Sequence, residues 1–345
     1  MKRKSRILSI SSSLVSLSVL LLFVCQGVEN AAQRMRLWPK IEPFKADYLK
    51  VSKIHEIYYE LSGNPEGKPV FFLHGGPGSG SSPYMRRFCD PKKFLIVLSD
   101  QRGAGKSKPY GEIKENTTQH LVEDIERLRK HLKVGKIILF GGSWGTTLAL
   151  AYAETYPKNV SGMVLRGVFC ATKEEIDHFY HGDVGRYFPD AYEALVATLP
   201  DPSRRPLPEY LFKLISEGNK ADKAKYSEAW AWYEGKISGL VVPDKVIEDW
   251  IKNSNPYAFG LFENYYMANG CFLEEGQLFR DAKKISHIPT SIINGRYDVI
   301  CPPITAYKLH KLLPKSKLVI AEGAGHWMGE RPVESALLKA MSEFE

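Results

Sequence analysis

The sequence has few cysteines, and none of them has the spacing of a metal site. Five cysteines occur in 345 residues, and none forms a C-x-x-C pair. No Cys/His cluster has ligand spacing either, which argues against a structural zinc. The spacing favours no particular disulfide, so we expect isolated buried thiols and predict neither a metal nor an organic cofactor. The cysteines are Cys25, Cys89, Cys170, Cys271 and Cys301.

Internal repeats, low-complexity tracts and basic runs are missing as well. Half of the net charge of +8 lies in residues 1–34, which hold five basic residues and one acidic residue. No Lys/Arg cluster with interleaved aromatics follows, so nucleic-acid binding is not predicted. The apolar content of 44% is ordinary for a globular protein. The length allows one large domain with an insertion, or two domains, and indicates no oligomeric state.

No apolar run is long enough for a transmembrane helix. The stretch 14–24 is about half of the roughly 20 residues that a span requires. It follows the basic cluster 2–6, in the plan of a secretory signal. We therefore treat 1–34 as a leader and expect an exported mature protein without a stable membrane span. No A-x-A cleavage site is present, and Cys25 fits a lipoprotein box only loosely; if Met35 is the true start, the protein is cytoplasmic.

Two glycine-rich stretches lack the spacing of phosphate-binding loops. Residues 74–80, His-Gly-Gly-Pro-Gly-Ser-Gly, do not fit G-x-G-x-x-G, and 105–107 fails as a Walker A loop because position 100 is Asp. The first stretch follows an apolar strand and is typical of an oxyanion loop, where glycine lets backbone N–H groups approach a substrate. The alternative is a plain surface loop. We expect Asp100 and Arg102 to anchor loops through side-chain hydrogen bonds.

What the sequence does contain is a G-x-S-x-G pattern at 141–145, with Ser143 at its apex. An apolar run precedes it and a helix-forming run follows, which is the context of a nucleophile elbow. Such a turn raises the serine hydroxyl above the sheet edge. It also places the Trp144 N–H at a helix N-terminus, where it can face a developing negative charge.

Apolar runs alternate with helical patterns on both sides of this motif, which predicts a mostly parallel, doubly wound α/β sheet. The alternation stops near residue 172 and resumes near 289. We predict a catalytic domain from 35–172 and 287–345, with 173–286 inserted as a helical cap. The predicted strands are 54–61, 70–73, 94–98, 137–140, 163–165, 289–294 and 318–320.

Asp298 and His326 each lie in a loop just after a predicted strand, downstream of Ser143. The order Ser, Asp, His is that of the α/β hydrolases. A serine hydroxyl is a poor nucleophile until an imidazole takes its proton, so we expect His326 to be the general base and then the acid for the leaving group. Asp298 would hold the other imidazole nitrogen.

Five motifs together resemble the proline iminopeptidases (prolyl aminopeptidases) of the α/β-hydrolase superfamily. They are H-G-G-P-G-S-G, D-Q-R-G-A-G-K-S, G-G-S-W-G-T-T-L-A-L-A-Y, G-R-Y-D and E-G-A-G-H. The resemblance runs from about Met35 to the C-terminus, with Lys106 where the family motif leads us to expect Arg. It implies the α/β-hydrolase fold and a serine aminopeptidase that releases N-terminal proline from peptides. With the elbow, it gives Trp144 and Gly76 as oxyanion donors.

The resemblance also implies which cap residues bind the substrate. An N-terminal proline is a cationic amine on an apolar ring, and a pocket for it needs carboxylates beside aromatics. By likeness to family segments, Glu234 and Glu263 bind the amine, and Arg166 and Phe169 line the pocket. Phe179 or Tyr180 is a further candidate. The competing interpretation makes the glutamates surface residues and the aromatics cap core.

Two other functions remain open on the sequence. One is a carboxylesterase or amidase of the same fold that acts on neutral acyl substrates. The other is a non-catalytic binding relative, which the intact Ser143, Asp298 and His326 disfavour. Dehalogenases and epoxide hydrolases of this fold use a carboxylate nucleophile, and position 143 is Ser.

Overall fold

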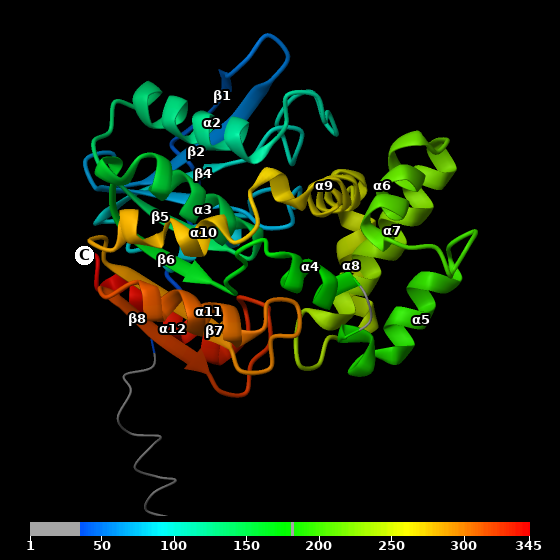
Figure 1. The fold of residues 1–345 in the computed structure, drawn as a ribbon. Helices are drawn as coiled ribbons and strands as arrows, with labels where there is room; N and C mark the ends of the chain where they lie inside the picture. The colour runs from blue at the N-terminus through cyan, green and yellow to red at the C-terminus, as the bar shows by residue number, and fades with distance from the viewer. Residues whose placement is uncertain (1–34, 181–182) are drawn as a thin grey trace, which may run out of the picture. The chain divides into compact units, whose positions relative to one another are not determined.

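Strands and helices alternate at the two ends of the chain, and helices fill the middle (Figure 1). The computed structural model describes residues 35–180 and 183–345, so the leader predicted at 1–34 lies outside the described residues. Leu37–Glu345 form one unit. None of the helices in the described ranges is long and apolar enough to cross a membrane.

In the described part of the chain, eight strands form one sheet in the order β1-β2-β4-β3-β5-β6-β7-β8. The β1/β2 and β2/β4 pairs are antiparallel, and the other neighbours are parallel. This confirms the predicted α/β class. The predicted strands are present, while β1 was missed because its residues are mostly exposed and show no apolar run. The strands are β1 (Lys45–Lys50), β2 (Glu56–Gly63), β3 (Lys68–Leu73), β4 (Phe94–Ser99), β5 (Ile137–Gly142), β6 (Val160–Arg166), β7 (Thr290–Gly295) and β8 (Ser316–Ala321).

Both faces of the sheet are covered, because successive side chains of a strand point to opposite faces. In β3, Phe71 and Leu73 join the core under one layer of helices, whereas Val70 and Phe72 join the core under the other. Continuous apolar strands therefore suit a sheet buried on both sides. The first layer contains α2 (Thr118–His131), α3 (Trp144–Thr155) and α11 (Pro303–Leu312), and the second contains α12 (Arg331–Ser342) and the short η1 (Pro83–Phe88).

The inserted segment is helical and gathers beside the sheet in Figure 1. Its centre is aromatic: Tyr180 stacks on Trp230 with ring centroids 4.9 Å apart, and Phe179 meets the same indole edge-on. The short α10 (Gln277–Arg280) packs on α3, against the sheet domain. The other helices are α4 (Lys173–Tyr180), α5 (Pro189–Ala197), α6 (Leu207–Glu217), α7 (Lys220–Ile237), α8 (Asp244–Asn253) and α9 (Tyr257–Ala268).

A buried carboxyl on α3, that of Glu154, lowers the stability of the folded protein when it is charged. Glu154 is 8% exposed, and within the described residues neither of its carboxyl oxygens has a hydrogen-bond partner. Burial, helped by the nearby Asp281, raises the pKa of Glu154 to about 8, while Lys284 and Arg280 act in the opposite direction. The folded state therefore holds a proton that the unfolded chain releases near pH 4.5.

We expect Glu154→Gln to stabilise the protein at alkaline pH. Because the folded-state pKa is raised, the native state loses stability as the pH rises from about 4.5 to about 8. The variant should gain roughly 2–4 kcal/mol in the free energy of unfolding at pH 9 and show a much smaller difference at pH 5. Urea unfolding at both pH values measures this, with Glu193→Gln, at an exposed position of α5, as the control. An equal effect at both pH values would contradict the assignment.

Candidate active site

Ser143 stands on a sharp turn between β5 and α3, as the G-x-S-x-G pattern predicts. Its backbone has φ 57° and ψ −128°, a conformation that residues other than glycine rarely adopt. The neighbouring glycines make room: an added Cβ on Gly145 would lie 2.1 Å from the Leu73 carbonyl oxygen, and one on Gly141 would lie 2.3 Å from the Gly145 carbonyl oxygen. The Ser143 N–H donates to the Arg166 carbonyl at 2.8 Å, which ties the turn to the end of β6.

Asp298 and His326 are buried, and their side chains meet. Asp298 Oδ2 lies 2.8 Å from His326 Nδ1. The other carboxylate oxygen accepts hydrogen bonds from the backbone N–H groups of Ile300 and Cys301, at 3.0 and 2.8 Å. The carboxylate is thus held from both sides, and its orientation fixes the imidazole.

Arg166 contacts His326 at the ring nitrogen that does not face Asp298. Its Nη1 donates to His326 Nε2 at 3.0 Å and to the His326 carbonyl oxygen at 2.9 Å. A guanidinium only donates, so Nε2 is the acceptor and Nδ1 carries the proton given to Asp298. Burial lowers the pKa of Arg166, while the charges of Asp298 and Glu234 oppose that shift.

Of the two hydrogen bonds expected among Ser143, His326 and Asp298, the structure contains one. The Asp298–His326 hydrogen bond is present, but among the described residues no hydrogen bond joins Ser143 to His326. Arg166 occupies the nitrogen that would accept the serine proton, and Ser143 instead lies near Cys301 in the same hollow. Catalytic hydrogen bonds are often formed only when substrate is bound.

A small hollow surrounds Ser143 and brings several predicted residues together. Its free volume is about 10 Å³, the room that one water molecule needs. A prolyl ring would require the side chains around it to move. Residues that line the hollow are Gly76, Ser143, Trp144, Phe169, Ile176, Phe179, Glu263, Met267, Ile300 and Cys301.

The two N–H groups predicted to hold an oxyanion come from separate segments that meet at Ser143. The first N–H groups of a helix have no intrahelical acceptor, so that of Trp144, at the start of α3, is available. Gly76 has φ 100° and lies in the loop after β3. That loop packs against the turn, since an added Cβ on Gly75 would lie 3.2 Å from Ser143 Cβ. Both residues line the hollow beside the serine.

The two cap glutamates approach each other in the interior, and neither is a simple surface residue. Glu263 on α9 is buried and accepts a hydrogen bond from Trp230 Nε1 at 2.7 Å. Glu234 on α7 lies within hydrogen-bonding range of Glu263, and its own Oε2 is buried without a partner among the described residues. Burial raises the pKa of both carboxyls, and the Glu234 charge raises that of Glu263 further. The two carboxyls therefore titrate as a coupled pair, in which charge on one disfavours charge on the other.

Aromatic side chains close the hollow beside these carboxyls. Phe169 is buried at its wall, and its backbone is held by Thr146 and Thr147, whose hydroxyls bond to the Phe169 N–H and carbonyl at 2.9 and 2.7 Å. Phe179 lines the same hollow, whereas Tyr180 stacks behind it on Trp230. The sequence did not single out Cys301, although it lies between Asp298 and Ser143; only its nearness to Asp298 in the chain could have indicated this.

No group of three or more metal-ligating side chains is close enough to hold an ion within residues 35–180 and 183–345. The four cysteines of these ranges are free and buried, as expected from their spacing. Burial raises the pKa of each thiol well above its usual value.

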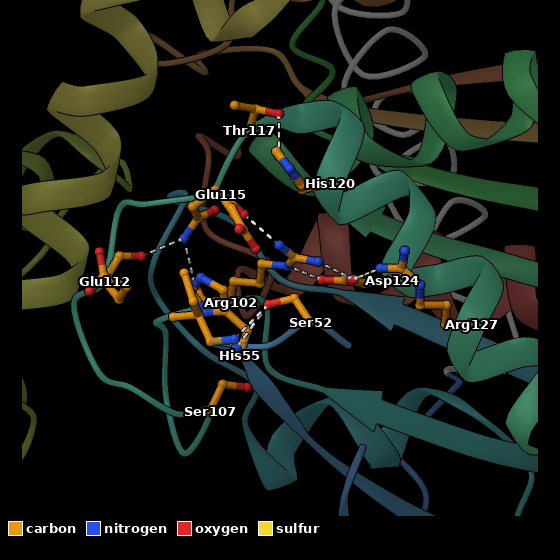
Figure 2. A network of polar contacts seen from close by, with 12 residues as sticks. Ser52, His55, Arg102, Ser107, Glu112, Glu115, Thr117, His120, Asp124 and Arg127 are labelled. Carbon is orange, nitrogen blue, oxygen red and sulfur yellow. Dashed lines mark hydrogen bonds and ion pairs between the residues drawn. The ribbon is translucent and has the colours of Figure 1, made fainter. Parts of the chain in front are cut away.

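Arg102 anchors the loop after β4, which confirms the role expected for it (Figure 2). Its guanidinium is fully buried and donates to both carboxylate oxygens of Asp124, at 2.5 and 2.7 Å, and to the Glu115 carbonyl at 2.5 Å. Asn116 in turn donates to the Arg102 carbonyl and accepts from Tyr266 of α9 at 2.9 Å. This buried network joins the loop to both α2 and the cap.

A serine on a glycine turn, followed in the chain by an Asp–His pair after two later strands of a mostly parallel sheet, defines an α/β hydrolase. The family model for the alpha/beta hydrolase fold matches residues 68–330. An alpha/beta hydrolase from a Medee basin deep-sea metagenome superposes with a TM-score of 0.62, covering 86% of this chain and 97% of that one at 20% identity. An esterase from Exiguobacterium antarcticum gives 0.61 over 87% and 99%, at 21% identity.

The chain belongs to the proline iminopeptidase family. It is 43% identical over 310 residues to the probable proline iminopeptidase of Leptolyngbya boryana, covering 90% of this chain and 97% of that protein. The proline iminopeptidase of Xylella fastidiosa strain 9a5c is 44% identical over 312 residues, with coverages of 89% and 99%. That of Arabidopsis thaliana is 42% identical, with coverages of 90% and 83%.

Gly167 lies under the Asp298–His326 pair, so we expect Gly167→Ala to disable the serine. An added Cβ would lie 2.9 Å from His326 Cε1 and 3.0 Å from Nδ1, at a residue with φ 59°. Displacing the imidazole by about 1 Å should slow labelling of Ser143 by a fluorophosphonate at least about 100-fold. Gly135→Ala, where an added Cβ meets nothing within 4 Å, is the control and should react normally. Normal labelling of both variants would show that the imidazole is not displaced or is not needed.

Proposed function

We propose that this protein is a serine aminopeptidase that releases proline from the N-terminus of peptides through an acyl-enzyme intermediate. Family membership supports the reaction. The observation that carries the substrate is the pair Glu234 and Glu263 near Ser143. Glu263 lines the apolar hollow and Glu234, which is half-buried, lies beside it, and carboxyls in such a place suit a cationic amine on an apolar ring. In this proposal residues 173–286 act as the cap, since α7 and α9 bring the pair.

The roles at the sheet edge follow from the contacts. Ser143 Oγ attacks the carbonyl carbon of the first peptide bond as His326 Nε2 takes its proton. Asp298 keeps Nδ1–H oriented and stabilises the imidazolium. The N–H groups of Trp144 and Gly76 receive the charge on the carbonyl oxygen. His326 then protonates the departing amine, and a water molecule, activated by the same imidazole, hydrolyses the acyl-enzyme.

Arg166 must release His326 before this sequence can begin. Nε2 has one lone pair, and in the present structure the Arg166 guanidinium holds it at 3.0 Å. Asp298 and Glu234 both interact favourably with the Arg166 charge. The guanidinium can therefore leave His326 and still remain close to a carboxylate. We therefore propose that Arg166 is a pocket residue that contacts His326 in the free protein and Glu234 once it has moved.

Free and N-blocked substrates test the proposed function. Proline 4-nitroanilide should be hydrolysed and its N-acyl derivative should not, because acylation removes the positive charge that Glu234 and Glu263 bind. Ser143→Ala should lower kcat by at least about 1,000-fold. Equal rates on both substrates would instead support a neutral amidase or esterase.

Removing one of the two carboxylates should weaken binding of the substrate amine and leave the rate of acyl transfer largely unchanged. Glu234→Gln or Glu263→Gln should raise KM for proline 4-nitroanilide about 10- to 100-fold, since a buried charge-assisted contact is lost. A small neutral 4-nitrophenyl ester should be little affected. In the unmodified protein, KM for the proline substrate should rise as the pH falls through the raised pKa of Glu234, because a protonated pair no longer attracts a cation.

Glu228→Gln is the matched control for these variants. Glu228 lies on α7 with Glu234 but is exposed, so its KM should not change. Unchanged KM in all three variants, or an equal rise on the neutral ester, would remove the two glutamates from amine recognition.

A further inference from the structure

Gln101 lies between the two residues that fix the loop after β4. On one side, the Asp100 carboxylate accepts from the Ser81 N–H and hydroxyl, each at 2.7 Å, and from the Lys106 N–H at 2.8 Å. On the other side, Arg102 is held by Asp124 through two hydrogen bonds (Figure 2). The backbone of Gln101 is therefore fixed from both ends, although neither neighbour reaches Ser143.

Gln101 makes three hydrogen bonds to the two segments that supply the oxyanion donors, and its carbonyl accepts a fourth from the Ala104 N–H at 3.1 Å within its own loop. Its N–H donates to His74 Nε2 at 3.0 Å, and its side-chain Nε2 donates to the His74 carbonyl at 2.9 Å. Its side-chain Oε1 accepts from Trp144 Nε1 at 2.9 Å. The amide thus spans from the loop after β3 to the first residue of α3.

The imidazole of His74 extends this connection along the loop. Its Nδ1 lies 3.0 Å from the Gly75 carbonyl, which can only accept, so Nδ1 carries the proton and Nε2 accepts from Gln101. Burial lowers the pKa of His74, which agrees with a neutral ring. The next residues need this support: Gly76 and Gly78 both have φ 100°, in a region where glycine itself imposes little rigidity.

We propose that Gln101 is a positioning residue that sets the separation of the Gly76 and Trp144 N–H groups. This inference rests on the proposed function of those two groups as the oxyanion donors. An amide is suited to the task because it donates to the His74 carbonyl and accepts from the Trp144 indole at once. A leucine can do neither, and a carboxylate can only accept. Donors that move away from the developing oxyanion lose transition-state stabilisation without changing how the amine is held.

The test compares Gln101→Leu with Gln119→Leu. Gln119 is exposed and donates to the Phe272 carbonyl, so its variant loses one side-chain hydrogen bond far from Ser143. Gln101→Leu should lower kcat for proline 4-nitroanilide about 10- to 100-fold with KM within about twofold, and Gln119→Leu should leave both constants unchanged. The pH dependence of kcat should keep its midpoint, since His326 is untouched.

Trp144→Phe provides a second route to the same interaction if Gln101→Leu does not fold. It removes the indole donor together with part of a buried ring that packs against Tyr266, so kcat should fall, and combining the two variants should add little beyond the larger single effect. Labelling of Ser143 by a fluorophosphonate follows the oxyanion donors without a proline substrate, and both variants should label more slowly. Normal labelling and normal kcat in Gln101→Leu and Trp144→Phe would overturn the inference. Slow labelling of these variants in a protein that ignores proline 4-nitroanilide would keep the inference and reject the proline substrate.

Discussion

The turn at Ser143 is the constraint around which the rest of the site is arranged. A non-glycine residue at φ 57° costs on the order of 1–3 kcal/mol, and it persists only where its surroundings hold it. Here the absence of side chains on Gly141 and Gly145 lets β5, α3 and the end of β3 approach within contact. Because β5 lies between β3 and β6, the loops that follow these neighbours meet at the serine. The loop after β3 carries Gly76, and the end of β6 carries Arg166.

Charge at this edge is balanced among buried groups rather than by solvent. Arg166 interacts favourably with both Asp298 and Glu234, and Glu234 lies beside Glu263. Burial raises the pKa of both glutamates, because little solvent is present to stabilise their charged forms. A cationic amine beside them would favour the charged carboxylates, whereas a neutral acyl group would leave the cost of their burial uncompensated.

Much of the fold followed from simple patterns, and the failures have physical reasons. Buried parallel strands are apolar throughout and were predicted well, but β1 is an exposed edge strand whose pairing depends on β2 rather than on its own composition. Asp298 and His326 could be predicted because each follows a strand at the same edge. The contact of Arg166 with His326 joins residues 160 positions apart, and no local pattern encodes it. The sequence did not indicate a role for Gln101 either, because its partners His74 and Trp144 are distant in the chain and it is uncharged, unlike its neighbours Asp100 and Arg102.

Entry of a substrate would require part of the inserted segment 173–286 to move. The hollow has room for about one water molecule, and most of its walls belong to the turn at Ser143 and the loops after the strands, which the sheet and the Arg102 network hold in place. Ile176, Phe179, Glu263 and Met267 are the exceptions, because they lie on α4 and α9. Of these two helices, α9 is itself fixed to the site, since Tyr266 packs edge-on against Trp144 and Phe259 lies beside the loop that carries Gly76. Movement of α4 would enlarge the hollow and leave Ser143 and its oxyanion donors in place. Substrate entry would then depend on α4, while Glu263 on α9 keeps its position relative to the acyl-transfer groups of the sheet edge.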